Sequence, residues 1–339
     1  MKSSLNRREF CGLLTGGGLL AGGAKAGTGT PAEKAAAPPA GYLFAHMTRK
    51  DYGRLYYALS RDGRHWRPVN GGRRVLPEYR GHPDLMRGHD GRFYLTGNRP
   101  HRDGTIRFWV SDDLIHWTHL RDFVADMTDH PGYESPDPWH GAPKLFYDTA
   151  TRTYLLTWHF SNARKLKELP ENYWSGMKTF YVTSKDLRTF SKARRLFPDF
   201  KLATIDVIVR REAGRYYALL KDERYPDFGC PTGKTIRVAS ADHLTGPWSA
   251  PGPPISPNFR EAPTVIPRPD GRGWYLYFEQ YPGLHYDLAT APRLAGPWYD
   301  EYAPNYRPPE GARHGCMLAL TAPQYAALHA AFSDKPSAT

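Results

Sequence analysis

The stretch Ser60-Arg-Asp-Gly-Arg-His-Trp66 returns in related form four more times along the chain. Each copy starts with a small residue, continues with turn-forming residues and ends in an aromatic ring. The further copies are Ser111-Asp-Asp-Leu-Ile-His-Trp117, Ser184-Lys-Asp-Leu-Arg-Thr-Phe190, Ser240-Ala-Asp-His-Leu-Thr-Gly-Pro-Trp248 and Ala291-Pro-Arg-Leu-Ala-Gly-Pro-Trp298. Their aromatic ends are 50 to 73 residues apart, a period that is typical of the blades of a β-propeller.

A second pattern keeps step with the first and consists of an apolar strand, a turn and an aromatic strand. Its first example is Leu85-Met86 followed by Gly91-Arg-Phe-Tyr-Leu95. The others are Leu145-Phe146 with Thr151-Arg-Thr-Tyr-Leu-Leu156, Val207-Ile-Val209 with Gly214-Arg-Tyr-Tyr217, and Val265-Ile266 with Gly271-Arg-Gly-Trp-Tyr-Leu276. Each pair predicts a β-meander. Because a single meander cannot bury both of its faces, we expect the meanders to stack radially around a central channel.

The fifth blade is expected to join both ends of the chain. Only four strand pairs lie between Asp84 and Trp298, so Tyr42–Trp66 must combine with Arg313–Leu320. The sequence therefore predicts an all-β, five-bladed propeller over residues 41–332, closed by N- and C-terminal strands. Two β-sandwich domains are the alternative, but they give no reason for two repeats in step. Within Pro323–Phe332, apolar residues at helical spacing predict a short packing helix.

The composition agrees with a globular all-β protein. The chain has 339 residues, of which 40% are hydrophobic and 14% aromatic, so it can bury a full core. Its 31 prolines and 32 glycines, beside 22 tyrosines and 9 tryptophans, favour many short strands separated by turns.

The N-terminus resembles a twin-arginine export signal. Asn6-Arg7-Arg8-Glu9-Phe10 precedes an apolar, glycine-rich stretch, and Ala24-Lys25-Ala26 offers a cleavage site. We expect a signal peptide over residues 1–26, a flexible tether over 27–40 and a disordered tail over 333–339. A cytosolic amphipathic helix is the alternative for the first segment. The signal predicts that the protein is periplasmic or secreted. No stretch is long and apolar enough to span a bilayer, so no membrane insertion is expected.

The net charge of +12 falls to +9 when the signal's Lys2, Arg7, Arg8, Lys25 and Glu9 are left out, so the mature domain is basic. No run of lysine and arginine has the pattern of a nucleic-acid module, and we expect no nucleic-acid partner. Cys230 and Cys316 form either one disulfide or two buried thiols, and no zinc site is indicated.

Polar residues at the starts of the innermost strands converge on the axis of a propeller. These starts read Gly81-His-Pro-Asp84, Trp139-His-Gly-Ala-Pro-Lys144, Thr204-Ile-Asp206, Arg260-Glu-Ala-Pro263 and Arg313-His-Gly315. Nearly every blade therefore brings a titratable group to the same place.

Five short motifs in this order, Trp-x-x-Ala-Pro, Ile-Asp, Lys-Asp-Glu, Glu-x-Pro and Arg-His-Gly, resemble glycoside hydrolase family 43. The resemblance covers about residues 42–328. It implies a five-bladed propeller that cleaves glycosidic linkages with inversion. It also implies that Glu261 is the general acid and that Asp206 orients and tunes this acid. Inversion needs a protonated carboxyl and an ionised carboxylate roughly 6.5–9.5 Å apart.

The general base departs from the family pattern. The aspartate expected directly before proline is replaced by His82-Pro83-Asp84, so the carboxylate comes two residues late. Such a shift keeps the side chain on the same face of a strand but moves it about 6.6 Å along the axis. We expect Asp84 to be the base, with His82 as the alternative.

Further residues are candidates for substrate and metal binding. By resemblance, His314 matches an axial histidine that meets calcium or water, or else it is a core histidine. No cofactor is expected to be required, and a structural calcium ion at the axis is an option that the resemblance leaves open. Cations near the mouth would suit an anionic sugar, and aromatic or histidine side chains a sugar platform, with core packing as the alternative. The cations are Lys144, Lys221 and Arg313, and the platform candidates are Trp139, His140, Trp158 and Tyr281.

The leading hypothesis is thus an inverting glycosidase acting on an oligo- or polysaccharide as a monomer or small homo-oligomer. A carbohydrate-binding propeller without turnover and a propeller polysaccharide lyase are the alternatives. A lyase would use a base such as His82 or His140 and a cation such as Lys144 or Arg313 to neutralise a uronate.

Overall fold

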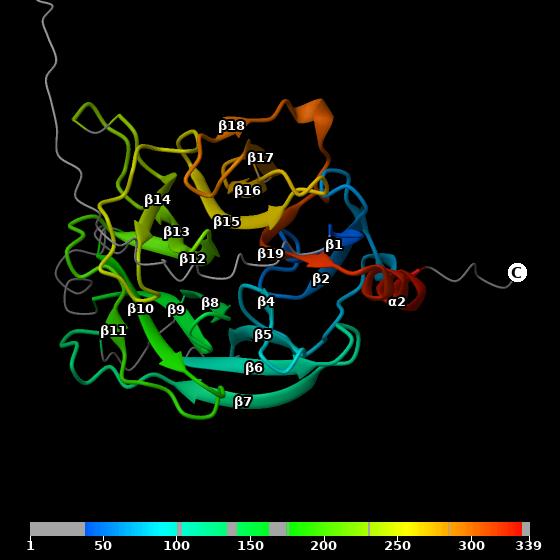
Figure 1. Ribbon diagram of the computed structural model, residues 1–339, viewed down its shortest axis with the longest axis horizontal. Helices are drawn as coiled ribbons and strands as arrows, with labels where there is room; N and C mark the ends of the chain where they lie inside the picture. Colours follow the sequence, from blue (N-terminus) through cyan, green and yellow to red (C-terminus); the bar gives the residue numbers. More distant parts are fainter. Residues whose placement is uncertain are drawn as a thin grey trace, which may run out of the picture. The chain divides into compact units, whose positions relative to one another are not determined.

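The computed structural model describes residues 38–99, 104–133, 141–162, 174, 176–229, 231–283 and 285–333. These residues form five antiparallel β-sheets around a central axis, with one α-helix among them (Figure 1). The predicted all-β, five-bladed propeller is confirmed. No helix in this part of the chain is long and apolar enough to cross a membrane. The expected signal peptide, most of the expected tether and the tail beyond residue 333 lie outside the described residues.

We number the blades in chain order from the first complete sheet. Blade 1 contains β4 (Asp84–Arg87), β5 (Phe93–Asn98), β6 (Thr105–Ser111) and β7 (Thr118–Val124). Blade 2 contains β8 (Gly141–Asp148), β9 (Thr153–Ser161), β10 (Met177–Ser184) and β11 (Arg194–Arg195). Blade 3 contains β12 (Thr204–Glu212), β13 (Arg215–Asp222) and β14 (Thr235–Ala241). Blade 4 contains β15 (Arg260–Pro267), β16 (Trp274–Gln280), β17 (His285–Ala291) and β18 (Tyr299–Asp300). Blade 5 contains β19 (Ala312–Leu320), β1 (Gly41–Thr48), β2 (Tyr56–Ser60) and β3 (Arg67–Pro68).

Blade 5 closes the ring as predicted. Its innermost strand β19 comes from the C-terminal part of the chain and pairs antiparallel with β1, with Tyr42 opposite Ala319. Each innermost strand also contacts the innermost strands of two neighbouring blades, in the cyclic order β4, β8, β12, β15, β19 and back to β4. The ring of blades is therefore closed, and the inner edge of each sheet lies against the neighbouring blades at the axis.

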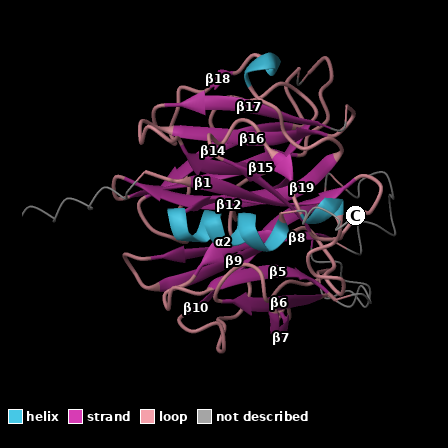
Figure 2. Cartoon of the chain, turned by 90° about the vertical axis from the view of Figure 1, so that its right-hand side faces the viewer, coloured by secondary structure: helices cyan, strands magenta, loops and turns pink. Residues whose placement is uncertain are grey.

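The predicted C-terminal helix is present as α2 (Ala322–Phe332) (Figure 2). Thr321 and Gln324 form a capping box at its start, which satisfies free backbone N–H groups. Tyr325 and Leu328 are buried in the cluster that joins blades 5 and 1, so the helix stabilises the closure. Two 3₁₀ turns, η1 (Asn70–Gly72) and η3 (Ala303–Asn305), complete the described elements.

The repeat found in the sequence is a hydrogen-bonded turn at the end of the third strand of a blade. In the first copy, the Ser60 hydroxyl accepts the N–H of Gly63 at 2.9 Å, and Asp62 accepts the N–H of Arg64 at 2.8 Å. The second copy repeats these contacts, with Ser111 accepting from Leu114 at 2.9 Å. The third copy does the same, with Ser184 accepting from Leu187 at 2.8 Å, so Ser and Asp recur at fixed spacing in these three blades because the turn uses both side chains.

Apolar clusters fill the spaces between neighbouring blades. The largest ones are rich in aromatic rings, such as the cluster of blades 1 and 2 that contains Phe108, Trp158 and Phe180. Equivalent clusters join the other four pairs of blades. This burial holds the blades in fixed register around the axis.

Candidate active site

The innermost strands β8, β12 and β15 each carry a β-bulge at their entry. The extra residues are Ala142-Pro143, Asp206-Val207 and Ala262-Pro263, and the first residue of each pair has a positive φ of 41°, 51° and 48°. A bulge bends the strand and re-aims a side chain. His82 lies two residues before Asp84, the first paired residue of β4, and Asp206 lies two residues before Ile208, where the pairing of β12 resumes after its bulge.

A cavity of about 310 Å³ opens where these entries meet. It collects side chains from all five blades or their connecting loops. The lining residues are Tyr52, His82, His159, Trp174, Ile205, Asp206, Lys221, Glu223, Lys234, Glu261, Tyr281, Arg313 and His314. The cavity is therefore the place at which residues far apart in the sequence converge on the axis.

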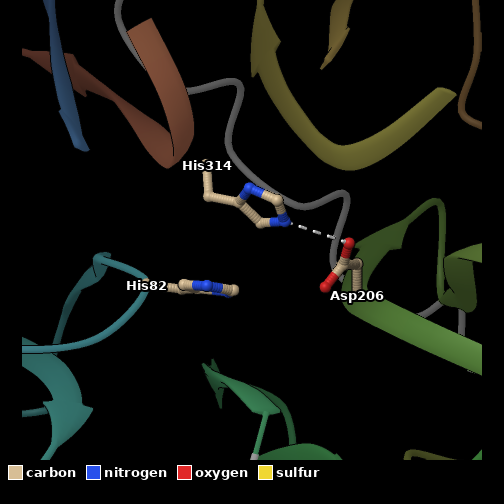
Figure 3. A group of neighbouring side chains, drawn as sticks. All are labelled: His82, Asp206 and His314. Carbon is tan, nitrogen blue, oxygen red and sulfur yellow. Dashed lines mark ion pairs between the residues drawn. The ribbon is translucent and has the colours of Figure 1, made fainter. Parts of the chain in front are cut away.

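His82, Asp206 and His314 form an axial triad at the floor of this cavity (Figure 3). One nitrogen or oxygen atom of each lies within 4.8 Å of the others. The ring centroids of the two histidines are 4.2 Å apart, and Nε2 of His314 lies 3.7 Å from Oδ2 of Asp206. Strands β12 and β19 and the segment that enters β4 thus place two imidazoles and one carboxylate together.

His314 is surrounded by carboxylates. Its Nδ1 lies 3.0 Å from Oε2 of Glu279, which also accepts the backbone N–H of His314 at 2.9 Å. Its Nε2 lies 3.5 Å from Oε1 of Glu261. Burial opposes the charged form, but Glu279 and Glu261 outweigh it and hold the pKa of His314 well above its usual value. The axis of the propeller is therefore occupied by an imidazolium.

Asp206 is held in the ionised form. Its side chain is 1% exposed, and this burial acts to raise its pKa, but hydrogen bonding and attraction from His314 outweigh burial and keep the pKa well below 3.8. Oδ2 also accepts the N–H of Ala262 at 3.1 Å. From the other side, the backbone N–H of Asp206 donates to Nδ1 of His159, whose pKa burial lowers to about 4.

Glu261 is the more accessible carboxylate, with 12% of its side chain exposed. Oε2 lies 2.7 Å from Nζ of Lys221, and Oε1 lies 3.5 Å from Nη2 of Arg313. Lys221 also pairs with Glu223 at 2.8 Å, and Glu223 pairs in turn with Lys234. Positive and negative groups thus alternate along this wall of the cavity.

His82 is neutral. Burial, followed by the nearby His314 cation, holds the pKa of His82 well below 6.5. Its Nε2 and the hydroxyl of Tyr52 form a 3.0 Å hydrogen bond. Because Tyr52 is 52% exposed, this bond connects the floor of the cavity to its rim.

A family model covers nearly the whole propeller. The model of Glyco_hydro_43_rel, described as a probable glycosyl hydrolase domain, matches residues 37–326. The chain belongs to this family. The resemblance to glycoside hydrolase family 43 is confirmed.

Solved structures of similar fold include glycosidases from fungi and bacteria. An exo-β-1,3-galactanase of Phanerochaete chrysosporium with galactose is 15% identical over 68% of this chain and 51% of that chain, with a TM-score of 0.51. A variant of that enzyme with β-1,3-galactotriose is 14% identical over 77% and 54%, with a TM-score of 0.51. An exo-β-1,3-galactanase of Clostridium thermocellum is 17% identical over 70% and 51%, with a TM-score of 0.49.

This member of Glyco_hydro_43_rel covers about half of the length of those three chains. At such identities the similarity shows the fold alone. No protein among the curated sequences matches the chain.

Asp84 does not line the cavity, contrary to the expectation that it shares one pocket with Asp206 and Glu261. Oδ2 of Asp84 accepts the N–H of Leu145 in blade 2 at 2.8 Å. Two residues at the same ladder position make equivalent bonds between blades: Thr264 accepts the N–H of Met317, and Cys316 accepts that of Leu85. Asp84 therefore joins blades one step below the cavity, because its two-residue shift carries it along the strand. Burial raises its pKa.

Lys144 and Trp158 also lie away from the cavity mouth. The ammonium of Lys144 is buried beside Asp84, with Nζ 3.6 Å from Oδ1. Trp158 is 1% exposed and packs in the cluster between blades 1 and 2, 6.3 Å from the ring of Phe180. For Trp158, the alternative of core packing is the correct one, because its side chain belongs to the face of β9 that meets blade 1.

The other predicted binding residues are mostly found together. Lys221, Tyr281 and Arg313 line the cavity, as His82 does. Trp139, His140 and Cys230 lie outside the described residues. Cys316 is a free, buried thiol.

Sequence analysis missed Tyr52, His159, Glu223, Lys234 and Glu279. Glu279 had a signal, because it is a carboxylate within the otherwise apolar and aromatic strand β16, directly opposite Glu261. Glu223 is the last residue of the Lys-Asp-Glu motif, in which only Lys221 had been given a role. The signal for His159 is Gly141 on the neighbouring strand. A Cβ at Gly141 would lie 2.1 Å from Nε2 of His159, so only glycine leaves room for this histidine.

The axial triad does not fit the calcium ion expected from the family resemblance. Calcium takes six to eight oxygen ligands. The triad offers two imidazoles and one carboxylate, and an oxygen of Asp206 already accepts a backbone N–H. In the second group of candidate ligands, Glu261 pairs with Lys221 and Glu279 pairs with Arg313. The His314 imidazolium supplies positive charge at this position instead.

Proposed function

We propose that the chain hydrolyses a glycosidic bond in a glycan, with Glu261 as the general acid of the axial cavity. The observation that carries this proposal is the contrast between two neighbouring carboxyl groups. Asp206 is buried and held ionised by His314, whereas Glu261 is partly exposed to the space that a substrate would enter. Carboxyl groups in different environments are the basis on which glycosidases divide acid and base work.

The two carboxyl groups lie close to each other. Nε2 of His314 lies 3.7 Å from Asp206 and 3.5 Å from Glu261, so the two oxygens are no farther apart than the sum of these distances. Both carboxyl groups can therefore act on one substrate in the cavity. His314 and Arg313 both lie 3.5 Å from Oε1 of Glu261, and of these two cations the imidazolium is the one that can return a proton to the acid between turnovers.

For the base we propose His82 in place of Asp84. His82 lines the cavity and is neutral, so its imidazole can accept a proton from water. Asp206, in the same triad, would stabilise the imidazolium that forms. Asp84 is separated from this water by its bond to Leu145 in the inter-blade layer.

We propose an uncharged sugar as the substrate, and this differs from the anionic sugar that the sequence favoured. Among the described residues that line the cavity, the cations of Lys221, Lys234 and Arg313 each pair with a carboxylate. A lyase needs a cation available for the uronate, so this pairing also favours hydrolysis over elimination.

A substrate panel tests the proposal. The purified protein would be incubated with p-nitrophenyl glycosides and with β-1,3-galacto-, arabino- and xylo-oligosaccharides, and the anomer formed first would be identified by NMR. We expect hydrolysis with inversion that Glu261→Ala abolishes, while the exposed control Glu78→Ala retains it. Binding of these sugars without release of product would instead indicate a carbohydrate-binding propeller, and an unsaturated product would indicate a lyase.

A further inference from the structure

A row of three aromatic side chains leads outward from the cavity. Tyr281 lines the cavity, the ring centroid of Phe259 lies 6.2 Å from that of Tyr281, and the ring of Tyr225 lies 5.8 Å from Phe259. On the inner side, Nζ of Lys221 lies 4.7 Å from the centroid of Tyr281. Tyr225 is 67% exposed, so the row begins in the cavity and ends in solvent. We call these three residues the aromatic row.

Phe259 holds the middle of the row in a conformation that a bulky residue rarely adopts. Its φ is +61°, in the left-handed region. Its ring belongs to none of the clusters that join the blades among the described residues. A bulky residue in this region raises the conformational free energy of the backbone, and such residues occur mostly at positions that have a function. Core packing therefore does not account for Phe259.

Hydrogen bonds fix the two segments that carry Phe259 and Tyr225. Asn258, next to Phe259, accepts the N–H of Gly233 at 3.2 Å and donates to the carbonyl of Pro231 at 3.0 Å. The N–H of Arg260 donates to the carbonyl of Lys234 at 2.7 Å. Lys234 lines the cavity, so the loop that presents Tyr225 is tied both to Phe259 and to the site.

We infer that the aromatic row binds sugar units beyond the bond that is cleaved, so that the substrate is a glycan chain of several units. This inference rests on the proposed function. Sugar rings have apolar faces that pack on aromatic rings, and tyrosine adds a hydroxyl for hydrogen bonding. Neighbouring rings of the row are inclined by 77° and 70°, so a chain that follows them turns from one unit to the next.

A glycan is the occupant that the position of the row favours. The row continues directly from Tyr281 in the cavity, and the loop of Tyr225 begins and ends beside cavity residues Glu223 and Lys234. A chain whose reacting unit lies at Glu261 would therefore reach Phe259 and Tyr225 with its next units. Phe228, three residues beyond Tyr225, is fully exposed and extends the apolar surface of the same loop.

Chain-length kinetics test the inference. The probes are the p-nitrophenyl glycoside and the di- to hexasaccharides of β-1,3-galactan, arabinan and xylan. In the wild-type enzyme we expect kcat/KM to rise with chain length for the glycan that is cleaved. In Tyr225→Ala and Phe259→Gly, the advantage of the hexasaccharide over the p-nitrophenyl glycoside should shrink by about three- to tenfold each, since one aromatic contact is worth about that much.

Matched variants separate binding from folding. Tyr299→Ala removes an aromatic ring that is 61% exposed on β18 of the same blade and should leave the chain-length profile unchanged. Glycine adopts a positive φ freely, so Phe259→Gly removes the ring without adding backbone strain, and thermal unfolding would verify its fold. Phe259→Leu keeps an apolar side chain and should still lose the advantage.

A flat wild-type profile, or variants that keep the full advantage of the hexasaccharide, would overturn the inference while leaving hydrolysis intact. If no probe is hydrolysed, the proposed function fails and calorimetry with the same hexasaccharides decides about the row alone. Weaker binding by Tyr225→Ala than by Tyr299→Ala would then support the row, and equal binding by both would overturn it.

Discussion

Replacing Glu279 by glutamine should destabilise the propeller through its axis. Glu279 is fully buried and carries the charge that balances His314 and Arg313, with Oε2 3.0 Å from Nδ1 of His314. Glutamine keeps an oxygen that can accept the backbone N–H of His314 but removes the negative charge. Breaking a buried ion pair by removing one partner costs about 3–5 kcal/mol. Taking the lower value, because the acceptor remains, we expect Tm to fall by about 6–12 °C.

The same substitution should change the pH dependence of stability. After the opposing effect of burial, Glu279 is the strongest contribution to the raised pKa of His314. A histidine whose pKa is raised on folding stabilises the protein fully below its unfolded pKa, near 6.5, and this contribution is lost as the pH rises through the folded value. Wild-type Tm should therefore fall in the alkaline range, and in Glu279→Gln the fall should begin at lower pH.

Calorimetric unfolding from neutral to alkaline pH measures both effects. The control is Glu301→Gln, which removes another Glu–Arg pair, with Arg64 at 2.9 Å, but one whose side chains are 19% and 23% exposed. A partly exposed pair contributes about 1 kcal/mol or less, so this variant should lose only a few degrees and keep the wild-type pH profile. A Glu279→Gln protein that is no less stable than Glu301→Gln would refute the buried imidazolium at the axis.

Three further predictions follow from the site and the N-terminus. Glu261→Gln should lose about 10²–10⁴ in rate on a natural glycoside but far less on a dinitrophenyl glycoside, whose phenolate leaves unaided; equal losses would exclude Glu261 as the acid. His82→Ala should lower kcat on both substrates, whereas Asp84→Asn should chiefly lower Tm. If Asp84→Asn lowers kcat more than His82→Ala does, the base is Asp84. Replacing Arg7 and Arg8 by lysine should keep the protein in the cytosol, and an unchanged periplasmic yield in cell fractions would contradict twin-arginine export.

The fold was predictable because its signals are local and repeated. The Ser60 turn satisfies its hydrogen bonds within five residues, and an equivalent turn ends the third strand of the next two blades. Closure by β1 and β19 followed from counting strand pairs, since the four internal pairs left Tyr42–Trp66 and Arg313–Leu320 to form the fifth blade together. Neither step required knowledge of contacts between blades.

The site was predictable only to the level of the strand entries. Which residue of His82-Pro83-Asp84 faces the cavity depends on where the ladder with β5 begins, and Asp84 is already paired with Thr96. The neighbour that occupies Asp84, the N–H of Leu145, belongs to another blade. Trp158 was misplaced for a related reason, because an aromatic residue in a strand reads the same whether its face meets a substrate or the next blade.

The ion pairs of the site were likewise not predictable from the sequence. The sequence displays lysines and arginines near the strand entries, and an excess of basic residues suggests attraction of an anion. In the structure, Lys221 bridges Glu223 and Glu261, and Arg313 contacts Glu279, so these cations hold the carboxylates of the cavity in place. Their role is positional, because a cation that already pairs with a buried carboxylate has little attraction left for a ligand. We therefore expect that a substrate is recognised by groups that the charge pattern does not reveal, namely the hydroxyls and aromatic rings of Tyr52 and Tyr281, which line the cavity.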